Sequence, residues 1–182
     1  MMKHIAVGCV LLSAVASQAQ VAFDTFGTGN STGGSGWGFG DLDDTRIASQ
    51  FTSASTGTLS AITMRLQRSS TPANATITIF QDSGNNIGAA MARFSVRVST
   101  GGLVTIRSSN PNNQLIAGRK YWLEVKTTVA GSGLYSGWSW NNRTIRGLIK
   151  FGKAAGQKPS YAVGNGVLPA FRVEVARPRL IP

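Results

Sequence analysis

Apolar and polar side chains alternate with a period of two in several segments of the chain. In residues 62–67 every second residue is apolar, and Arg65 is one of the polar residues between them. The same alternation recurs in residues 94–98, 121–126 and 171–175. Successive side chains of a strand point to opposite faces, so each segment predicts a strand with one buried face. Helical spacing with capping residues is hard to find.

Turn-forming residues separate these segments from six shorter strand candidates. The candidates are residues 21–26, 46–52, 76–80, 103–107, 135–140 and 145–151. Clusters of Gly, Asn, Ser and Pro predict turns at residues 82–86, 99–102, 108–113, 130–133 and 164–166. About ten short strands divided in this way predict an all-β protein, an antiparallel β-sandwich that resembles a jelly roll.

Residues 27–40 stand out because glycine is so frequent there. Such a segment is too rich in glycine for a regular strand, and it is expected to run as a surface loop or to pack Trp37 and Phe39 as anchors. It is not a phosphate-binding loop, because no Gly-Lys-Ser/Thr ending or following helix is present.

The first residues have the pattern of a secretory signal. Lys3 precedes a short apolar run over residues 5–15, and small residues follow at 17–19. The run is shorter than the ~20 apolar residues that a membrane-spanning helix needs. We therefore expect a cleaved signal peptide over residues 1–19, one β-sandwich domain over residues 20–182, and a secreted or periplasmic protein.

Cleavage would change the available chemistry, because His4 and Cys9 are the only histidine and cysteine. A mature chain then has 1 − 1 = 0 of each, which excludes disulfides, thiol nucleophiles, histidine-based triads and Cys or His zinc sites. Loss of Lys3 takes the net charge from +11 to 11 − 1 = +10. This charge favours anionic partners outside the cell, which would be acidic polysaccharide, envelope phosphates or released nucleic acid, without specific nucleic-acid recognition. The alternative is a solvated basic surface that keeps the protein soluble.

Five segments carry a resemblance to a known family. In order, they are Phe23-Asp24-Thr25-Phe26-Gly27, residues 78–84 with Ile87-Gly88, residues 115–123, Trp138-Ser139-Trp140-Asn141-Asn142 and residues 168–173. Together they resemble the bacterial choice-of-anchor domains, exported modules that often precede a C-terminal sorting tail. The resemblance implies an extracellular β-sandwich and supplies no catalytic residue. Residues 176–182 lack the Pro-Glu-Pro signal of anchored members, so release, or retention through surface charge, is expected instead.

Aromatic residues suggest a first candidate site. Trp138 and Trp140 are two residues apart, so in a strand both indoles leave the same face and are able to stack on sugar rings. Asn141 and Asn142 would then bind hydroxyl groups, and Trp37 is a third aromatic candidate. The alternative is that this face is the core, since Trp buries a large area.

Basic residues suggest a second site. Outward positions of the predicted strands carry Arg65, Arg93, Arg97, Lys120, Lys126 and Arg172. Neighbouring strands that align them would form a positive face for phosphates or uronates. The alternative is that they protect sheet edges against aggregation.

Acidic residues suggest a third candidate site. Asp41, Asp43 and Asp44 offer a cluster of oxygen ligands suited to calcium, although they lack the EF-hand spacing and have Arg46 as an alternative partner. Asp82 is expected to cap a turn.

These observations favour a non-enzymatic exported protein that associates with a cell surface or matrix by weakly binding carbohydrate or anionic polymer. One alternative is an enzyme that acts on polysaccharide through two carboxylates, for which Glu124 and Glu174 are candidates. The other is a structural protein that assembles with itself through exposed sheet edges.

Overall fold

The computed structural model describes residues 18–39, 45–67, 73–98, 101–127, 136–153 and 162–177. These residues form strands throughout, apart from loops and the short 3-10 turn η1 (Thr28–Asn30). The strands are β1 (Ala19–Asp24), β2 (Thr32–Phe39), β3 (Thr45–Thr52), β4 (Gly57–Gln67), β5 (Ala73–Asp82), β6 (Ile87–Val98), β7 (Gly102–Arg107), β8 (Gln114–Leu115), β9 (Lys120–Thr127), β10 (Ser136–Asn141), β11 (Arg146–Lys153), β12 (Ala162–Val167) and β13 (Phe171–Ala176).

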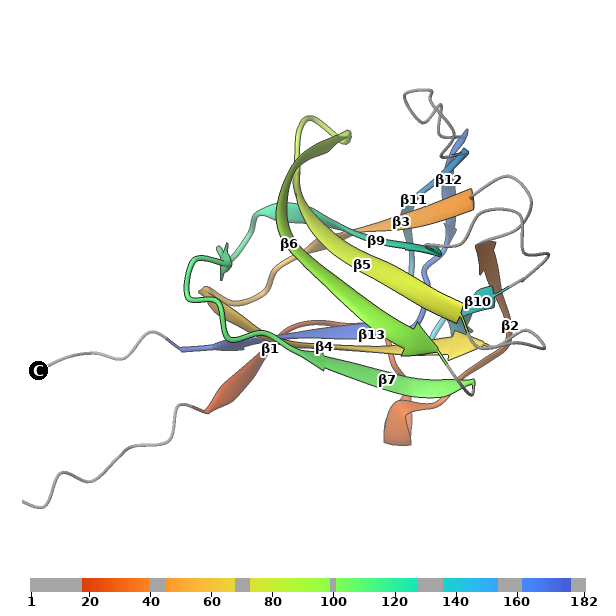
Figure 1. Ribbon diagram of the computed structural model, residues 1–182, viewed down its shortest axis with the longest axis horizontal. Helices are drawn as coiled ribbons and strands as arrows, with labels where there is room; N and C mark the ends of the chain where they lie inside the picture. Colours follow the sequence, from red (N-terminus) through yellow and green to blue (C-terminus); the bar gives the residue numbers. More distant parts are fainter. Residues whose placement is uncertain are drawn as a thin grey trace, which may run out of the picture.

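Two antiparallel sheets pack face to face, which confirms the predicted β-sandwich (Figure 1). Sheet A has the order β1-β13-β4-β10-β2, and β7 and β8 also pair with β4. Sheet B has the order β12-β11-β3-β9-β5-β6. Apart from the consecutive pairs β5–β6 and β11–β12, neighbouring strands are not consecutive in the sequence, so non-local pairing largely determines which side chains meet.

The core lies between the two sheets and contains the apolar half of each alternating strand. In β13, Phe171, Val173 and Val175 are fully enclosed, while the residues between them are half-buried. Trp138 of β10 joins the same cluster. Burial of one large apolar side chain contributes ~1.5–3 kcal/mol, so this interior is the main source of stability in the absence of disulfides.

The glycine-rich segment forms strand β2, so the expected surface loop is wrong. β2 is an edge strand that pairs with β10, and Trp37 lies opposite Trp138. A Cβ atom on Gly36 would collide with the backbone of Trp138, so glycine allows the close approach of the two strands. Trp37 packs as expected, and its indole N–H donates to the Val167 carbonyl oxygen of sheet B at 2.9 Å.

Two further strands were not predicted. β12 includes Gly164, Asn165 and Gly166, which we expected to form a turn, and β8 has only two residues. The turn predicted at residues 82–86 is confirmed at residues 83–86, whereas residues 130–133 lie outside the described part of the chain.

The N-terminal prediction is untested, because residues 1–17 lie outside the described part and β1 begins at Ala19. Within the described residues, no helix is both long and apolar enough to cross a membrane.

Candidate functional site

The outer face of sheet B carries several polar and charged side chains. In β9, Leu123 and Val125 belong to the core. Strand side chains alternate between faces, so the outward residues of β9 are Trp122, Glu124 and Lys126.

Cross-strand pairing brings three basic residues to one region of this face. Lys126 of β9 lies opposite Thr76 of β5, which lies opposite Ser95 of β6. Arg93 and Arg97 flank Ser95 on the same side of β6, and both are exposed. Arg93, Arg97 and Lys126 are called the basic patch below.

The spacing between the cations of the basic patch suits a polymer that carries anionic groups at intervals. Arg93 and Arg97 are four residues apart, so their Cα atoms are ~13 Å apart at about 3.3 Å per residue. Lys126 lies two strands from Ser95, or ~10 Å at about 4.8 Å per strand. The exposed Ser95 lies between the two arginines, whereas Thr76, between Ser95 and Lys126, is buried. None of the described carboxylates forms an ion pair with the three cations.

Register also places a carboxylate near the basic patch, but that group is already engaged. Glu124 lies opposite Thr78, and Thr78 lies opposite Arg93. The Glu124 side chain is only 3% exposed, and one of its oxygens is 3.6 Å from Arg46 Nη1. The buried pair therefore leaves the positive charge at the surface largely uncancelled.

The other basic candidates lie elsewhere. Lys120 is on the outer face of sheet B, but near the opposite end of β9, where its Nζ donates to Asn85 Oδ1 at 3.0 Å. Arg65 is exposed on β4 of sheet A, and Arg172 is on β13 of the same sheet. The structure thus brings four of the six predicted cations to one face and places two on the other sheet.

The end of the β5–β6 hairpin, at the top of Figure 1, covers part of the outer face of sheet B. Asp82 Oδ1 accepts hydrogen bonds from the indole N–H of Trp122 and from Gln50 Nε2, each at 2.7 Å. Asp82 Oδ2 accepts the backbone N–H of Asn85 at 3.0 Å, which confirms the predicted turn cap. Because Gln50 belongs to β3, the turn crosses over β9.

Two opposing effects act on the pKa of Asp82. Burial raises this pKa by disfavouring the charged carboxylate. The hydrogen bonds from Asn85, Gln50 and Trp122, together with the charge of Lys120, lower it and dominate. The net pKa lies below the ordinary value of 3.8, so Asp82 is ionised at neutral pH.

A buried lysine on this face was not anticipated from the sequence. Lys150 of β11 is only 4% exposed, and its Nζ donates to Asn86 Oδ1 at 2.8 Å. The same Nζ lies 5.1 Å from the ring centre of Trp122. Lysine is almost never fully buried without partners. The partners of Lys150 are distant from it in the sequence, so only the structure reveals them.

The aromatic candidates lie on the inner side of the sandwich. Trp138 is fully enclosed, and its indole N–H donates to the Ala170 carbonyl oxygen at 3.1 Å. Trp37 and Trp140 are half-buried and meet edge to face with ring centres 5.7 Å apart. The face shared by Trp138 and Trp140 is therefore core, which is the alternative considered above.

The two asparagines that follow are positioned by the fold. Asn141 is buried, and its side-chain Nδ2 donates to the carbonyl oxygens of Ile145 and Leu168 at 2.9 and 2.6 Å. Asn142 is exposed, and its Nδ2 donates to Ser31 Oγ at 2.8 Å. Asn141 thus stabilises the loop over residues 142–145, between β10 and β11.

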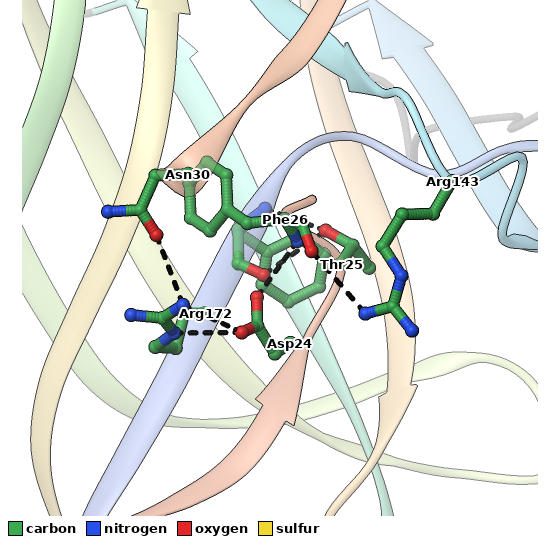
Figure 2. A network of polar contacts seen from close by, with 7 residues as sticks. Asp24, Thr25, Phe26, Asn30, Arg143 and Arg172 are labelled. Atoms are coloured by element: carbon green, nitrogen blue, oxygen red, sulfur yellow. Dashed lines mark hydrogen bonds and ion pairs between the residues drawn. The ribbon is translucent and has the colours of Figure 1, made fainter. Parts of the chain in front are cut away.

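A polar network joins the first strand to the last, as Figure 2 shows. Arg172 donates to Asp24 Oδ2 through Nε and Nη2 at 2.9 and 2.8 Å, and to Asn30 Oδ1 at 3.1 Å. The buried Thr25 hydroxyl contacts the Pro169 carbonyl oxygen at 2.8 Å and accepts the Phe171 N–H at 2.8 Å. The first and last segments of the family resemblance therefore meet here, as structural partners.

The carboxylates proposed for an enzyme do not come together. Glu124 points outward from sheet B, whereas Glu174 alternates with core residues of β13 and points outward from sheet A. The full thickness of the sandwich separates them. Asp41, Asp43 and Asp44 lie outside the described residues, so the calcium site remains a prediction.

No protein-family model matches the chain, and no curated protein matches it at a significant level.

Proposed function

We propose that this chain is an exported, non-enzymatic β-sandwich that binds acidic polysaccharide through the basic patch. The observation that carries the proposal is the meeting of Arg93, Arg97 and Lys126 on one face, without ion-pair partners among the described residues. The sequence charge of +11 supports the same conclusion, because it attracts polyanions over a distance.

The chemistry of the basic patch favours carboxylate or phosphate groups in a repeating chain. An arginine guanidinium donates two parallel hydrogen bonds to either group. The exposed hydroxyl of Ser95 lies between Arg93 and Arg97 and suits the hydroxyl groups of a sugar. Each exposed contact is weak, so retention would come from many repeats along one polymer.

The proposed cellular setting agrees with this chemistry. A cleaved signal peptide and membership of the choice-of-anchor family would both place the sandwich outside the cytoplasm. There, acidic polysaccharide is an abundant polyanion, and binding to it would retain the protein at a surface without a lipid or sorting anchor.

Three alternatives have less support. An enzyme that cleaves polysaccharide needs two carboxylates ~5–10 Å apart, and Glu124 and Glu174 face opposite sides of the sandwich. Sugar stacking on the Trp138–Trp140 face would require Trp138, which is fully enclosed. Self-assembly through the edge strand β6 would bring Arg93 and Arg97 of two copies together, which like-charge repulsion disfavours.

The proposal is tested by chromatography of the mature chain on immobilised alginate, a polyuronate, with polyphosphate and neutral dextran as comparison matrices. The variant Arg93→Ala/Arg97→Ala/Lys126→Ala should elute from alginate at a markedly lower salt concentration than the wild type.

The matched control, Arg65→Ala/Arg107→Ala/Arg119→Ala, removes the same charge from exposed residues outside the basic patch. It should elute close to the wild type. Equal losses in both variants would show that net charge alone governs retention. Tighter retention on polyphosphate than on alginate would overturn the polysaccharide assignment.

A further inference from the structure

Lys150 and Asn86 are positioned for a covalent reaction. We propose that the Lys150 amine attacks the Asn86 side-chain amide and forms an intramolecular isopeptide bond between β11 and the β5–β6 hairpin. Lys150 Nζ lies 2.8 Å from Asn86 Oδ1. The carbonyl carbon is one bond of about 1.2 Å beyond that oxygen, so it is at most ~4 Å from Nζ. Reactive approach requires ~3–3.5 Å, which a small side-chain rotation supplies.

The surroundings of Lys150 shield its amine from solvent. Its side chain is only 4% exposed, and the fully buried Trp122 lies on one side of Nζ. Low exposure keeps competing water away from the amine. The hairpin is held over the sheet by Asp82, so Asn86 is presented to Lys150 by a structured turn.

Glu124, which is paired with Arg46, lies on the same face and is the proton acceptor in the proposed reaction. Lys150 lies opposite Ala48, and Ala48 lies opposite Glu124. This pairing places Lys150 and Glu124 on the same face of sheet B, two strands apart, with Ala48 between them. Glu124 is 3% exposed, so both groups share a region that solvent scarcely reaches.

The reaction balances without an oxidant or an external cofactor. The Lys150 ammonium gives one proton to the Glu124 carboxylate, and the free amine then attacks Asn86 Cγ to form a tetrahedral intermediate. The Cγ–Nδ2 bond breaks as Nδ2 receives protons from Glu124 and from the former amine. The products are the Nζ–Cγ amide and one ammonium ion, which leaves through the exposed side of Asn86. Five N-bound hydrogens and one positive charge are present before and after the step.

Such a bond would close a loop of 64 residues. A cross-link of this kind restricts the unfolded chain, as a disulfide does. A mature chain that contains no cysteine would thereby gain a covalent cross-link, and this cross-link would fix the hairpin over Trp122. The residues involved are distinct from the basic patch, so this inference and the proposed function can fail separately.

The direct test is the intact mass of the purified mature chain, which should be lower than the sequence mass by one ammonia. A new N-terminal Gln20 also loses ammonia when it cyclises, so peptide mapping is required. A tryptic digest should contain a branched peptide that joins the segments around residues 86 and 150, with no cleavage after Lys150. Unmodified peptides from both segments, with cleavage after Lys150, would overturn the proposal.

Three variants test which side chains take part in the proposed reaction. Lys150→Arg should keep the fold and lose the branched peptide. Asn86→Asp should form the same bond with loss of water in place of ammonia, a mass change that a purely structural contact would not produce. Glu124→Gln should stay folded by circular dichroism and remain largely unlinked. Full cross-linking in Glu124→Gln would overturn the role of Glu124, and an ammonia loss that persists at these residues in Lys150→Arg would overturn the cross-link itself.

Discussion

Substitution of Asp82 by alanine should destabilise the protein mainly through one buried donor. The carboxylate accepts hydrogen bonds from Trp122, Gln50 and Asn85. Gln50 Nε2 retains a second acceptor, Asn85 Oδ1 at 3.1 Å, and the exposed Asn85 N–H can bind water. Trp122 is fully enclosed, so its indole N–H would lose its partner, at a cost of ~1–3 kcal/mol. We expect a total loss of ~2–3 kcal/mol in the free energy of unfolding.

Urea unfolding followed by fluorescence or circular dichroism measures the free energy of unfolding. A double-mutant cycle then shows how much of the loss comes from the Trp122 indole N–H. In a Trp122→Phe background the orphaned donor is absent, so Asp82→Ala should cost less than ~1 kcal/mol. Ser83→Ala, in the same exposed turn, should change stability by no more than ~0.5 kcal/mol. An equal cost for Asp82→Ala in both backgrounds would refute the assignment to the indole N–H.

The lowered pKa of Asp82 adds a pH dependence to the same experiment. A carboxyl group whose pKa is lower in the folded state contributes stability above its unfolded pKa and loses it as the pH falls through the folded pKa. The wild type should therefore lose more stability than Asp82→Ala as the pH falls below about 4. Parallel stability curves for the two proteins in that range would contradict the direction of the shift.

Two further predictions concern how the strands fit together. Gly36→Ala should lower the free energy of unfolding by ~1–3 kcal/mol, because the added methyl group meets backbone, whereas Gly34→Ala has open space and should cost less than ~0.5 kcal/mol; urea titration compares them. Thr25→Val should cost ~1–3 kcal/mol by leaving the buried Phe171 N–H without its acceptor, and Thr63→Val, which loses an exposed hydroxyl contact, should cost less than ~1 kcal/mol by the same titration. Equal costs within either pair would contradict the packing described.

Alternation predicted the fold class because one face of each strand is buried. β13 follows the pattern closely, and the inward residues of β9 are core residues as expected. The expectation of one buried face is wrong for β9, because Trp122 and Glu124 on its outer face are buried as well. The pattern failed at β2, where the partner strand β10 carries bulky tryptophans and glycine is required for close approach. A loop was a reasonable expectation from composition alone, since glycine weakens an isolated strand.

The candidate sites depended on information that a sequence does not contain. The outward positions of Arg93, Arg97 and Lys126 followed from alternation, but their proximity depends on β9, β5 and β6 being neighbours. The same pairing order separated Glu124 from Glu174. Trp138 and Trp140 share a face as predicted, and only the packing of the sheets decides that this face is internal.

The burial of Lys150 illustrates the same limit. Its neighbours Asn86 and Trp122 come from a distant hairpin and strand. Asn86 belongs to the turn between β5 and β6, two strands that curve strongly in Figure 1. No local sequence signal marks such an approach, because the sequence separation between Lys150 and Asn86 is 64 residues.

The salt dependence of polyanion binding tests the central claim most directly. The dissociation constant for soluble alginate is measured over a series of salt concentrations for the wild type and for the two triple variants. Each lost ionic contact should reduce the slope of log Kd against log salt by about 0.7–1, so the basic-patch variant should lose about 2–3 and the control almost none. The same reduction in both triple variants, or none in either, would contradict binding through Arg93, Arg97 and Lys126.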